Sequence, residues 1–184
     1  MSQDGDDKVQ LTRRDRQREE TRERVFQAAL EVFRRDGVDS CRIDDIATLA
    51  QVSRGSFYFH FPTKDDVLLE LMRITEGDVC DRLSNVPDDV AIVDFLEHVS
   101  VAFSDIWEGD PTLLPEVAGV ALKRVSAQIT DREISPLRFA LSKRFTLCGA
   151  RGELAPFLPP ETMADLYLAN CLAGMLAWCA APEL

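Results

Sequence analysis

A short stretch of the chain carries side chains suited to contacting a nucleic-acid duplex. Residues 52–61, VSRGSFYFHF, offer a cation, a bare backbone, a hydroxyl, two aromatic rings and an imidazole, at Arg54, Gly55, Ser56, Tyr58, Phe59 and His60. A major groove admits one helix, and groups near the N-terminus of that helix reach base edges and phosphates. These residue types therefore favour binding to double-stranded DNA. The alternative is an aromatic core segment, but no strand pattern lies nearby to pair with it.

Two short helices joined by a turn are expected to position these side chains. Apolar residues recur at helical spacing in the first helix, at Ile43, Ile46, Ala47 and Ala50. Ser53 is placed to cap the second helix, in which Phe57 and Phe61 share an inward face with Val52. The spacing therefore predicts a helix-turn-helix that leaves the polar and aromatic residues outward.

A longer helix is predicted on each side of this pair. The helix before it covers 21–36, with one apolar stripe made of Val25, Ala28, Ala29, Val32 and Phe33. Gly37 can take the left-handed conformation that ends this helix. The helix after the pair runs from Lys64 to about Arg82, with Thr63 and Asp66 as its cap. Free amides and the Lys64 ammonium suit a phosphate there, although an ordinary surface lysine is the alternative.

The segment ALEVFRRDGVDSCRIDDIATLAQVSRGSFYFHFPTKDDVLLEL resembles the DNA-binding domain of TetR-family transcriptional regulators, over roughly Thr21 to Leu83. Two positions depart from the family pattern. Many members carry Gly where Gln51 stands, because the turn can require a positive backbone angle. Many have Ser or Thr where this chain has Cys41 and Arg42. The resemblance implies operator DNA as a partner, and the expected DNA-binding residues are Arg42, Arg54, Gly55, Ser56, Tyr58, Phe59, His60 and Lys64.

Composition favours a folded, all-α protein. The chain has 184 residues, of which 46% are hydrophobic, and no run of strict alternation is present. Its net charge is -11, but residues 1–64 hold 12 Lys or Arg and 12 Asp or Glu, whereas residues 65–184 hold 9 and 20. All of the net acidity therefore lies outside the expected DNA-binding part. Repulsion should keep the rest of the chain off a duplex.

The expected organisation has three parts. Residues 1–20 form a flexible arm, 21–83 a three-helix helix-turn-helix domain, and 84–184 a helical ligand-binding and dimerisation domain. Within the arm, Arg13, Arg14, Arg16 and Arg18 can reach phosphates or a minor groove. They can equally form a solvated face with neighbouring glutamates. Further helices are predicted over 88–107, 112–127, 131–148 and 161–180.

The last predicted helix is apolar on nearly every side, so we interpret it as a buried helix. One side can meet the core of its own domain and the other a second subunit, which is where TetR-family proteins dimerise. Such proteins usually add one more helix after it. The resemblance also implies a repressor that a small, largely apolar ligand releases from its operator. Candidate ligand contacts, each also consistent with plain core packing, are Phe95, His98, Phe103, Trp107, Phe139, Phe145, Asn170, Cys171 and Met175.

Other function classes have little support. The five cysteines form no CxxC pair, and His60 and His98 are the two histidines, so we expect no metal site and a reducing cytoplasm. No catalytic string or cofactor motif is present, so we expect neither an enzyme nor a cofactor. The run Leu166–Ala181 has 16 residues, short of the ~20 that span a bilayer. The main alternative is a ligand-binding or protein-interaction module whose DNA-binding head is degenerate.

Overall fold

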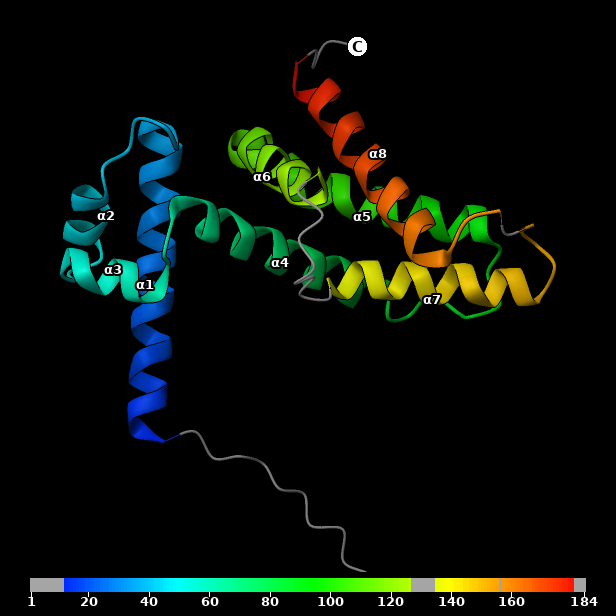
Figure 1. Ribbon diagram of the computed structural model, residues 1–184, viewed down its shortest axis with the longest axis horizontal. Coiled ribbons are helices and arrows are strands. Elements are labelled where there is room, and N and C mark those ends of the chain that lie inside the picture. Colours follow the sequence, from blue (N-terminus) through cyan, green and yellow to red (C-terminus); the bar gives the residue numbers. More distant parts are fainter. Residues whose placement is uncertain (1–11, 127–134, 156, 181–184) are drawn as a thin grey trace, which may run out of the picture. The chain divides into compact units, whose positions relative to one another are not determined.

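The computed structural model describes residues 12–126, 135–155 and 157–180, and helices are the regular elements throughout these ranges (Figure 1). In chain order they are α1 (Arg13–Asp36), α2 (Ile43–Leu49), α3 (Arg54–His60), α4 (Lys64–Leu83), α5 (Ile92–Glu108), the 3-10 helix η1 (Pro111–Leu113), α6 (Leu114–Ser126), α7 (Pro136–Ala150) and α8 (Pro160–Ala180). The all-α prediction is confirmed. The chain divides into two compact units, Met1–Val67 and Leu68–Leu184. This division falls inside α4, earlier than the boundary after residue 83 that the sequence suggested.

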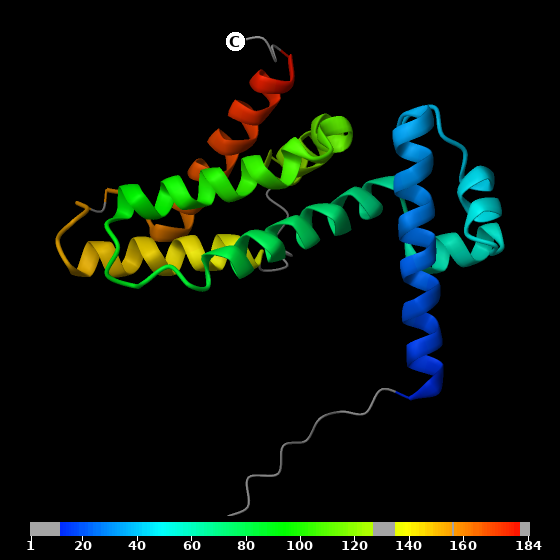
Figure 2. The same ribbon diagram turned by 180° about the vertical axis from the view of Figure 1, so that it is seen from behind.

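In the N-terminal unit, α2 and α3 pack against the long helix α1 (Figures 1 and 2). The buried stripe of α1 consists of Val25, Phe26, Ala28, Ala29, Leu30, Val32 and Phe33. Ile46 of α2 and Phe57 of α3 are fully buried, and Phe61 directly after α3 is 1% exposed. Burying a side chain of this size stabilises the fold by about 1.5–3 kcal/mol. The core therefore fixes which face of α3 points outward.

The start of α1 corrects the prediction of a flexible arm. The Thr12 hydroxyl accepts a hydrogen bond from the Asp15 amide at 3.2 Å, and the Asp15 carboxylate accepts one from the Thr12 amide at 3.1 Å. This reciprocal cap satisfies amides that a helix end otherwise leaves unpaired. Residues 13–20 are consequently helical, and the arm prediction is wrong for them. The remainder of the predicted arm, residues 1–11, lies outside the described residues.

The turns of the N-terminal unit follow the sequence signals. Gly37 ends α1 at φ 78°, in the left-handed region that glycine tolerates. Gln51, in the turn between α2 and α3, is the one non-glycine residue with positive φ, 57°, among those described. The Asp66 carboxylate accepts from the Thr63 amide at 2.8 Å, and the Thr63 hydroxyl accepts from the Asp66 amide at 3.2 Å. The α2–α3 turn and the start of α4 are therefore built as expected.

In the C-terminal unit, α7 packs along α8, α6 also contacts α8, and α5 contacts α7. The core of the unit includes Phe95, Val99, Leu114, Leu137 and Leu141. Two helices begin later than predicted. α5 starts at Ile92 because Arg144 holds the carbonyls of Pro87 and Asp88 in a turn, at 3.0 and 2.7 Å. α7 starts at Pro136, with the Ser135 hydroxyl accepting from the Arg138 amide, and residues 131–134 lie outside the described residues.

Helix α8 is only partly buried within one chain. Of its residues only Ala164 and Met175 are buried, whereas Leu166 is 57% and Trp178 44% exposed. This agrees with the prediction that one side of the helix meets the core of its own domain, since α6 and α7 cover part of the surface of α8. Burial of the other side by a second subunit stays a prediction. Counted from Pro160 the helix has 21 residues, and by length and composition alone it passes the test for a membrane-crossing helix. The core helices of soluble proteins pass the same test.

Candidate DNA interface and ligand cavity

Helix α3 is anchored from behind by aromatic packing. The Ser53 hydroxyl accepts a hydrogen bond from the Ser56 amide at 3.1 Å and so starts the helix where the sequence placed it. The ring of Phe61 stacks on Phe26 of α1 with centroids 6.1 Å apart, and Phe57 lies 6.4 Å from Phe61. These contacts set the rotation of α3 about its own axis. The opposite face of α3 is consequently presented to solvent.

The exposed face of α3 carries the groups that the sequence identified. Tyr58 is 42% and Phe59 64% exposed, and the side chain of Arg54 is 60% exposed. Gly55 is exposed as well, and Ser56 and His60 are half-buried. The structure therefore brings these six predicted residues together on one short helix. Such a surface can place a cation, a hydroxyl and aromatic rings in a major groove.

Asp44 of α2 holds the cation of this face in position. Its carboxylate lies 3.3 Å from Nη1 of Arg54 and 3.9 Å from Nη2 of Arg42. The Arg54 guanidinium also lies 5.8 Å from the centre of the Tyr58 ring. Tyr58, and after it Asp44, raise the pKa of Arg54. Arg42 and Arg54 thus share one carboxylate, which a DNA phosphate would have to displace.

Helix α1 contributes two arginines beside α3. Arg18 lies over the ring of Phe59 at 5.0 Å and Arg22 over the ring of Phe61 at 4.3 Å. Burial lowers the pKa of His60, and the charges of Arg18 and Arg22 lower it further. The His60 imidazole is therefore uncharged at neutral pH and can both donate and accept a hydrogen bond. The surface beside α3 thus includes Arg18, one of the arginines assigned to the arm.

Lys64 has a different surrounding from the one expected. Its ammonium donates hydrogen bonds to the carbonyl oxygens of Val38 and Asp39, at 2.7 and 3.3 Å. Its side chain is half-buried, and it ties the loop after α1 to the start of α4. An interhelical loop leaves carbonyl groups without helical partners, and the lysine satisfies two of them. Within the N-terminal unit the contacts of Lys64 are thus structural.

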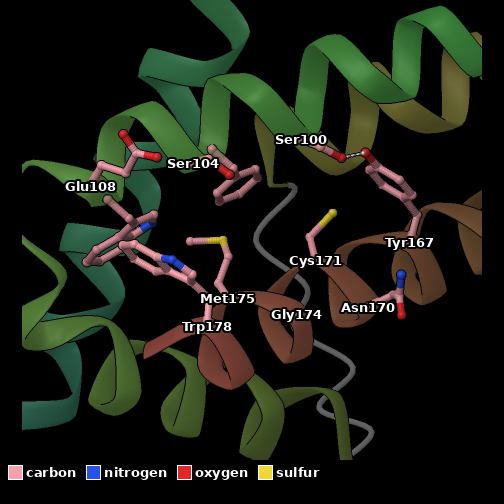
Figure 3. Close-up of a pocket in the computed structure, with 11 residues that line it drawn as sticks. Ser100, Ser104, Glu108, Tyr167, Asn170, Cys171, Gly174, Met175 and Trp178 are labelled. Carbon is pink, nitrogen blue, oxygen red and sulfur yellow. Dashed lines mark hydrogen bonds between the residues drawn. The ribbon is translucent and has the colours of Figure 1, made fainter. Parts of the chain in front are cut away.

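A cavity of about 500 Å³ lies between α5 and α8 in the C-terminal unit (Figure 3). Its lining consists of Ser100, Phe103, Ser104, Trp107, Glu108, Tyr167, Asn170, Cys171, Gly174, Met175 and Trp178. This volume lies in the range of small-molecule sites, which are mostly apolar with a few polar anchors. Of the predicted ligand contacts, the cavity brings together Phe103, Trp107, Asn170, Cys171 and Met175.

One end of the cavity carries a network of uncharged polar groups. Ser100 and Tyr167 share a hydrogen bond of 2.8 Å (Figure 3). The Tyr167 hydroxyl donates to the carbonyl of Leu96 at 2.5 Å. Burial raises the pKa of Tyr167 and that of the neighbouring Cys171 thiol. Both groups are therefore neutral across the physiological range. They can offer a ligand hydrogen bonds but no charge.

The other predicted ligand contacts lie outside this cavity. Phe95 is 4% exposed and lies 4.2 Å beneath the Arg144 guanidinium, while Phe145 is a core residue at 7% exposure. Phe139 is 61% exposed on α7. His98 is exposed, and its Nδ1 lies 2.6 Å from the carbonyl of Asp94. Periodicity placed these residues on helices without showing which helix faces border a hollow.

Comparison with known proteins agrees with the N-terminal geometry. Residues 25–71 match the family model for bacterial regulatory proteins of the tetR family, and this segment contains α2, α3 and the buried half of α1. The regulator AcrR of Shigella flexneri is 36% identical over 61 residues. Residues 25–71 therefore carry the helix-turn-helix of the TetR family. The AcrR match covers 33% of this chain and 28% of that protein.

The TetR-family likeness also extends beyond that region, at lower identity. UidR of Escherichia coli strain K12 is 22% identical over 166 residues, which covers 89% of this chain and 84% of UidR. The crystal structure of Thermus thermophilus FadR, a TetR-family repressor in complex with lauroyl-CoA, superposes with a TM-score of 0.58 at 25% identity. That superposition covers 89% of this chain and 95% of FadR. The TetR-family fold therefore includes the helical C-terminal part.

Sequence reasoning missed several residues that shape these TetR-family sites. Asp44 was noted only as part of the family string, and its pairing with Arg54 depends on how α2 packs beside α3. Ser100 and Tyr167 are 67 positions apart and meet only through the packing of the C-terminal unit. Glu108 and Trp178 line the cavity without having been singled out. No local sequence pattern identifies these residues. Arg18, in contrast, belongs to the basic run before the first predicted helix.

Proposed function

We propose that the chain is a sequence-specific DNA-binding regulator that acts in the cytoplasm as a dimeric repressor. The observation that carries the proposal is the orientation of α3, with Phe57 and Phe61 at 1% exposure or less and Tyr58 and Phe59 exposed. An anchored short helix with an open polar and aromatic edge is what a major groove accommodates. We assign DNA binding to the N-terminal unit, through Arg42, Arg54, Gly55, Ser56, Tyr58, Phe59 and His60. For Lys64 we propose a supporting role through its loop contacts.

The distribution of charge supports this assignment. Arg13, Arg14, Arg16 and Arg18 are exposed in the first turns of α1, while the excess acidity lies beyond residue 64. Phosphate contacts dominate the affinity of most DNA-binding proteins and make it depend on salt. The acidic remainder of the chain would be repelled by DNA. The chain should therefore approach a duplex with its N-terminal unit.

The open surface of α8 supports dimerisation. Leu166, Asn170, Ala173 and Ala177 recur at intervals of three or four residues, and all are exposed in the single chain. Small residues on such a stripe let a second helix approach closely, and a mostly apolar helix surface is costly to leave in water. We propose that the same stripe of a second chain covers it. A dimer would also carry two copies of α3, as palindromic operators require.

Ligand control is proposed for the cavity between α5 and α8. FadR of Thermus thermophilus was solved with lauroyl-CoA bound, which supports a ligand-binding role for the corresponding helical domain. A ligand changes operator affinity only if it binds the DNA-competent and DNA-incompetent states with different free energies. Ordinary coupling of ~1–3 kcal/mol would change that affinity by roughly 5- to 150-fold.

The test is DNA binding by a pair of arginine variants. Genomic fragments retained by the purified protein at low salt supply the operator, and fluorescence anisotropy then measures its affinity across a salt series. Arg54→Ala should weaken binding and reduce the slope of log affinity against log salt by about one. Arg82→Ala is the matched control, because Arg82 is also an exposed arginine paired with one aspartate, Asp105, at 3.0 Å. It should leave both quantities unchanged.

A negative result has a defined meaning. If no fragment is retained at low salt, the DNA-binding proposal fails. The chain is then better described as a ligand-binding or interaction module with a degenerate head. If Arg54→Ala and Arg82→Ala behave alike, DNA is bound through another surface. Either outcome would remove α3 from the proposed interface.

A further inference from the structure

The cavity between α5 and α8 is unusual in its charge. Among the described residues that line it, Glu108 is the single charged side chain, and no lysine or arginine is present. Glu108 is exposed, and none of the described residues forms an ion pair with it. An anionic ligand would therefore meet a carboxylate with no compensating cation. A cationic ligand would instead be attracted by this carboxylate.

The backbone adds to the negative charge at one end of the cavity. Glu108 is the last residue of α5, and Trp178 lies in the last turn of α8. Figure 3 shows Glu108 and Trp178 at the same end, with Ser100 and Tyr167 at the other. The C-terminus of a helix carries a partial negative charge, and neither α5 nor α8 has a basic residue in its last turn. The end near Glu108 is consequently electronegative.

Aromatic rings line the same region. Trp107 is 5% exposed and forms part of the wall, and Trp178 supplies a second indole that is still 44% exposed. Phe103 and Met175 add apolar surface between this end and the polar network. An indole face attracts a cation within about 6 Å, most strongly where water is excluded. Carboxylate, helix ends and indoles therefore favour the same sign of ligand charge.

We propose that this cavity binds a lipophilic organic cation, with its positive centre near Glu108, Trp107 and Trp178 and its apolar groups on Phe103 and Met175. The proposal rests on the proposed ligand-binding role of the cavity and specifies the chemical class of that ligand. Quaternary ammonium and phosphonium compounds with aromatic or alkyl substituents belong to this class. Hydrogen-bonding substituents would meet Ser100 and Tyr167 at the opposite end.

The test uses two ions of nearly identical shape and opposite charge, tetraphenylphosphonium and tetraphenylborate. The chain has two tryptophans, and both line the cavity, so indole emission reports on this site alone. Titration of the full chain should give saturable binding of tetraphenylphosphonium, about tenfold tighter than that of tetraphenylborate. Glu108→Gln should weaken tetraphenylphosphonium binding by about fivefold and leave tetraphenylborate unaffected or bound more tightly.

Glu97→Gln is the matched control, because the protein as a whole is acidic and attracts cations unspecifically. Glu97 is exposed on the same helix, lies outside the lining of this cavity and changes the net charge equally. The control variant should keep the full preference for the cation. Equal binding of the two ions, an equal loss in both variants, or no binding of tetraphenylphosphonium would each overturn the proposal. Operator binding, measured on the same preparations, separates such a failure from failure of the DNA-binding function.

Discussion

Replacing Phe57 by alanine should destabilise the N-terminal unit severely, whereas the same replacement at Phe59 should not. Phe57 is fully buried, and removing a buried phenylalanine ring costs about 3–5 kcal/mol. Domains of this kind have a total stability of only about 5–15 kcal/mol. Phe59 is 64% exposed, and its truncation removes chiefly the contact with Arg18, worth about 0.5–1 kcal/mol. The same replacement of phenylalanine by alanine therefore tests the anchoring of α3 at Phe57 and the recognition of DNA at Phe59.

The assay combines urea unfolding, followed by far-UV circular dichroism, with operator binding by fluorescence anisotropy. Phe57→Ala should lose both stability and DNA binding. Phe59→Ala should keep its unfolding midpoint and yet bind the operator about tenfold more weakly, because an exposed apolar contact with a base edge is lost. If Phe59→Ala unfolds as easily as Phe57→Ala, the outward face of α3 is part of a core and the proposed interface is wrong.

Three further substitutions test other parts of the account. Gln51→Gly should stabilise the protein by about 0.5–1 kcal/mol in urea unfolding, because Gln51 has φ 57° and glycine adopts this conformation without strain; a loss of stability would contradict this. Burial raises the pKa of Glu76, with the Ser135 hydroxyl opposing the shift, so the folded state binds the proton more tightly than the unfolded state. The contribution of Glu76 to stability should thus fall as the pH rises from below 4.5 through its folded-state pKa, and Glu76→Gln should remove this contribution in urea titrations between acid and neutral pH; a pH profile that the substitution leaves unchanged would contradict this. Leu166→Glu should convert a dimer of 20.6 kDa chains into monomers in sedimentation equilibrium, because it places a charge on the exposed stripe of α8; persistence of the dimer would locate its interface elsewhere.

The local geometry of the helix-turn-helix could be predicted from the sequence because its determinants are close together along the chain. Ser53 caps α3 three residues before the amide it binds, and Thr63 and Asp66 cap α4 over the same spacing. The apolar residues of α3 recur at one helical turn, so its buried face follows from periodicity. The departure at Gln51 was also informative, because the position takes the positive φ that a glycine would have supplied.

Contacts between helices could not be predicted in the same way. The pairing of Arg54 with Asp44 and the hydrogen bonds from Lys64 to Val38 and Asp39 depend on packing angles that no local pattern encodes. Lys64 was expected to meet a phosphate because free amides and the lysine ammonium lie together at a helix N-terminus. Here the loop after α1 provides carbonyl oxygens within reach.

The cavity was only partly predictable for a related reason. Aromatic residues and methionines at helical spacing identify candidates for burial, and Phe103, Trp107 and Met175 were among them. Whether such a residue borders a hollow or a filled core depends on how closely two helices approach. Phe145 belongs to the filled part, whereas Glu108 and Trp178 border the hollow.

Footprinting of a selected genomic fragment tests whether α3 reads double-stranded DNA as one of a pair. We expect two protected half-sites whose centres are one DNA turn, about 34–36 Å, or a multiple of it apart. Protection should weaken as salt rises and disappear in the Tyr58→Ala variant, while the unfolding midpoint of that variant stays nearly unchanged. A single protected site without a repeat, or full protection by Tyr58→Ala, would contradict the claim.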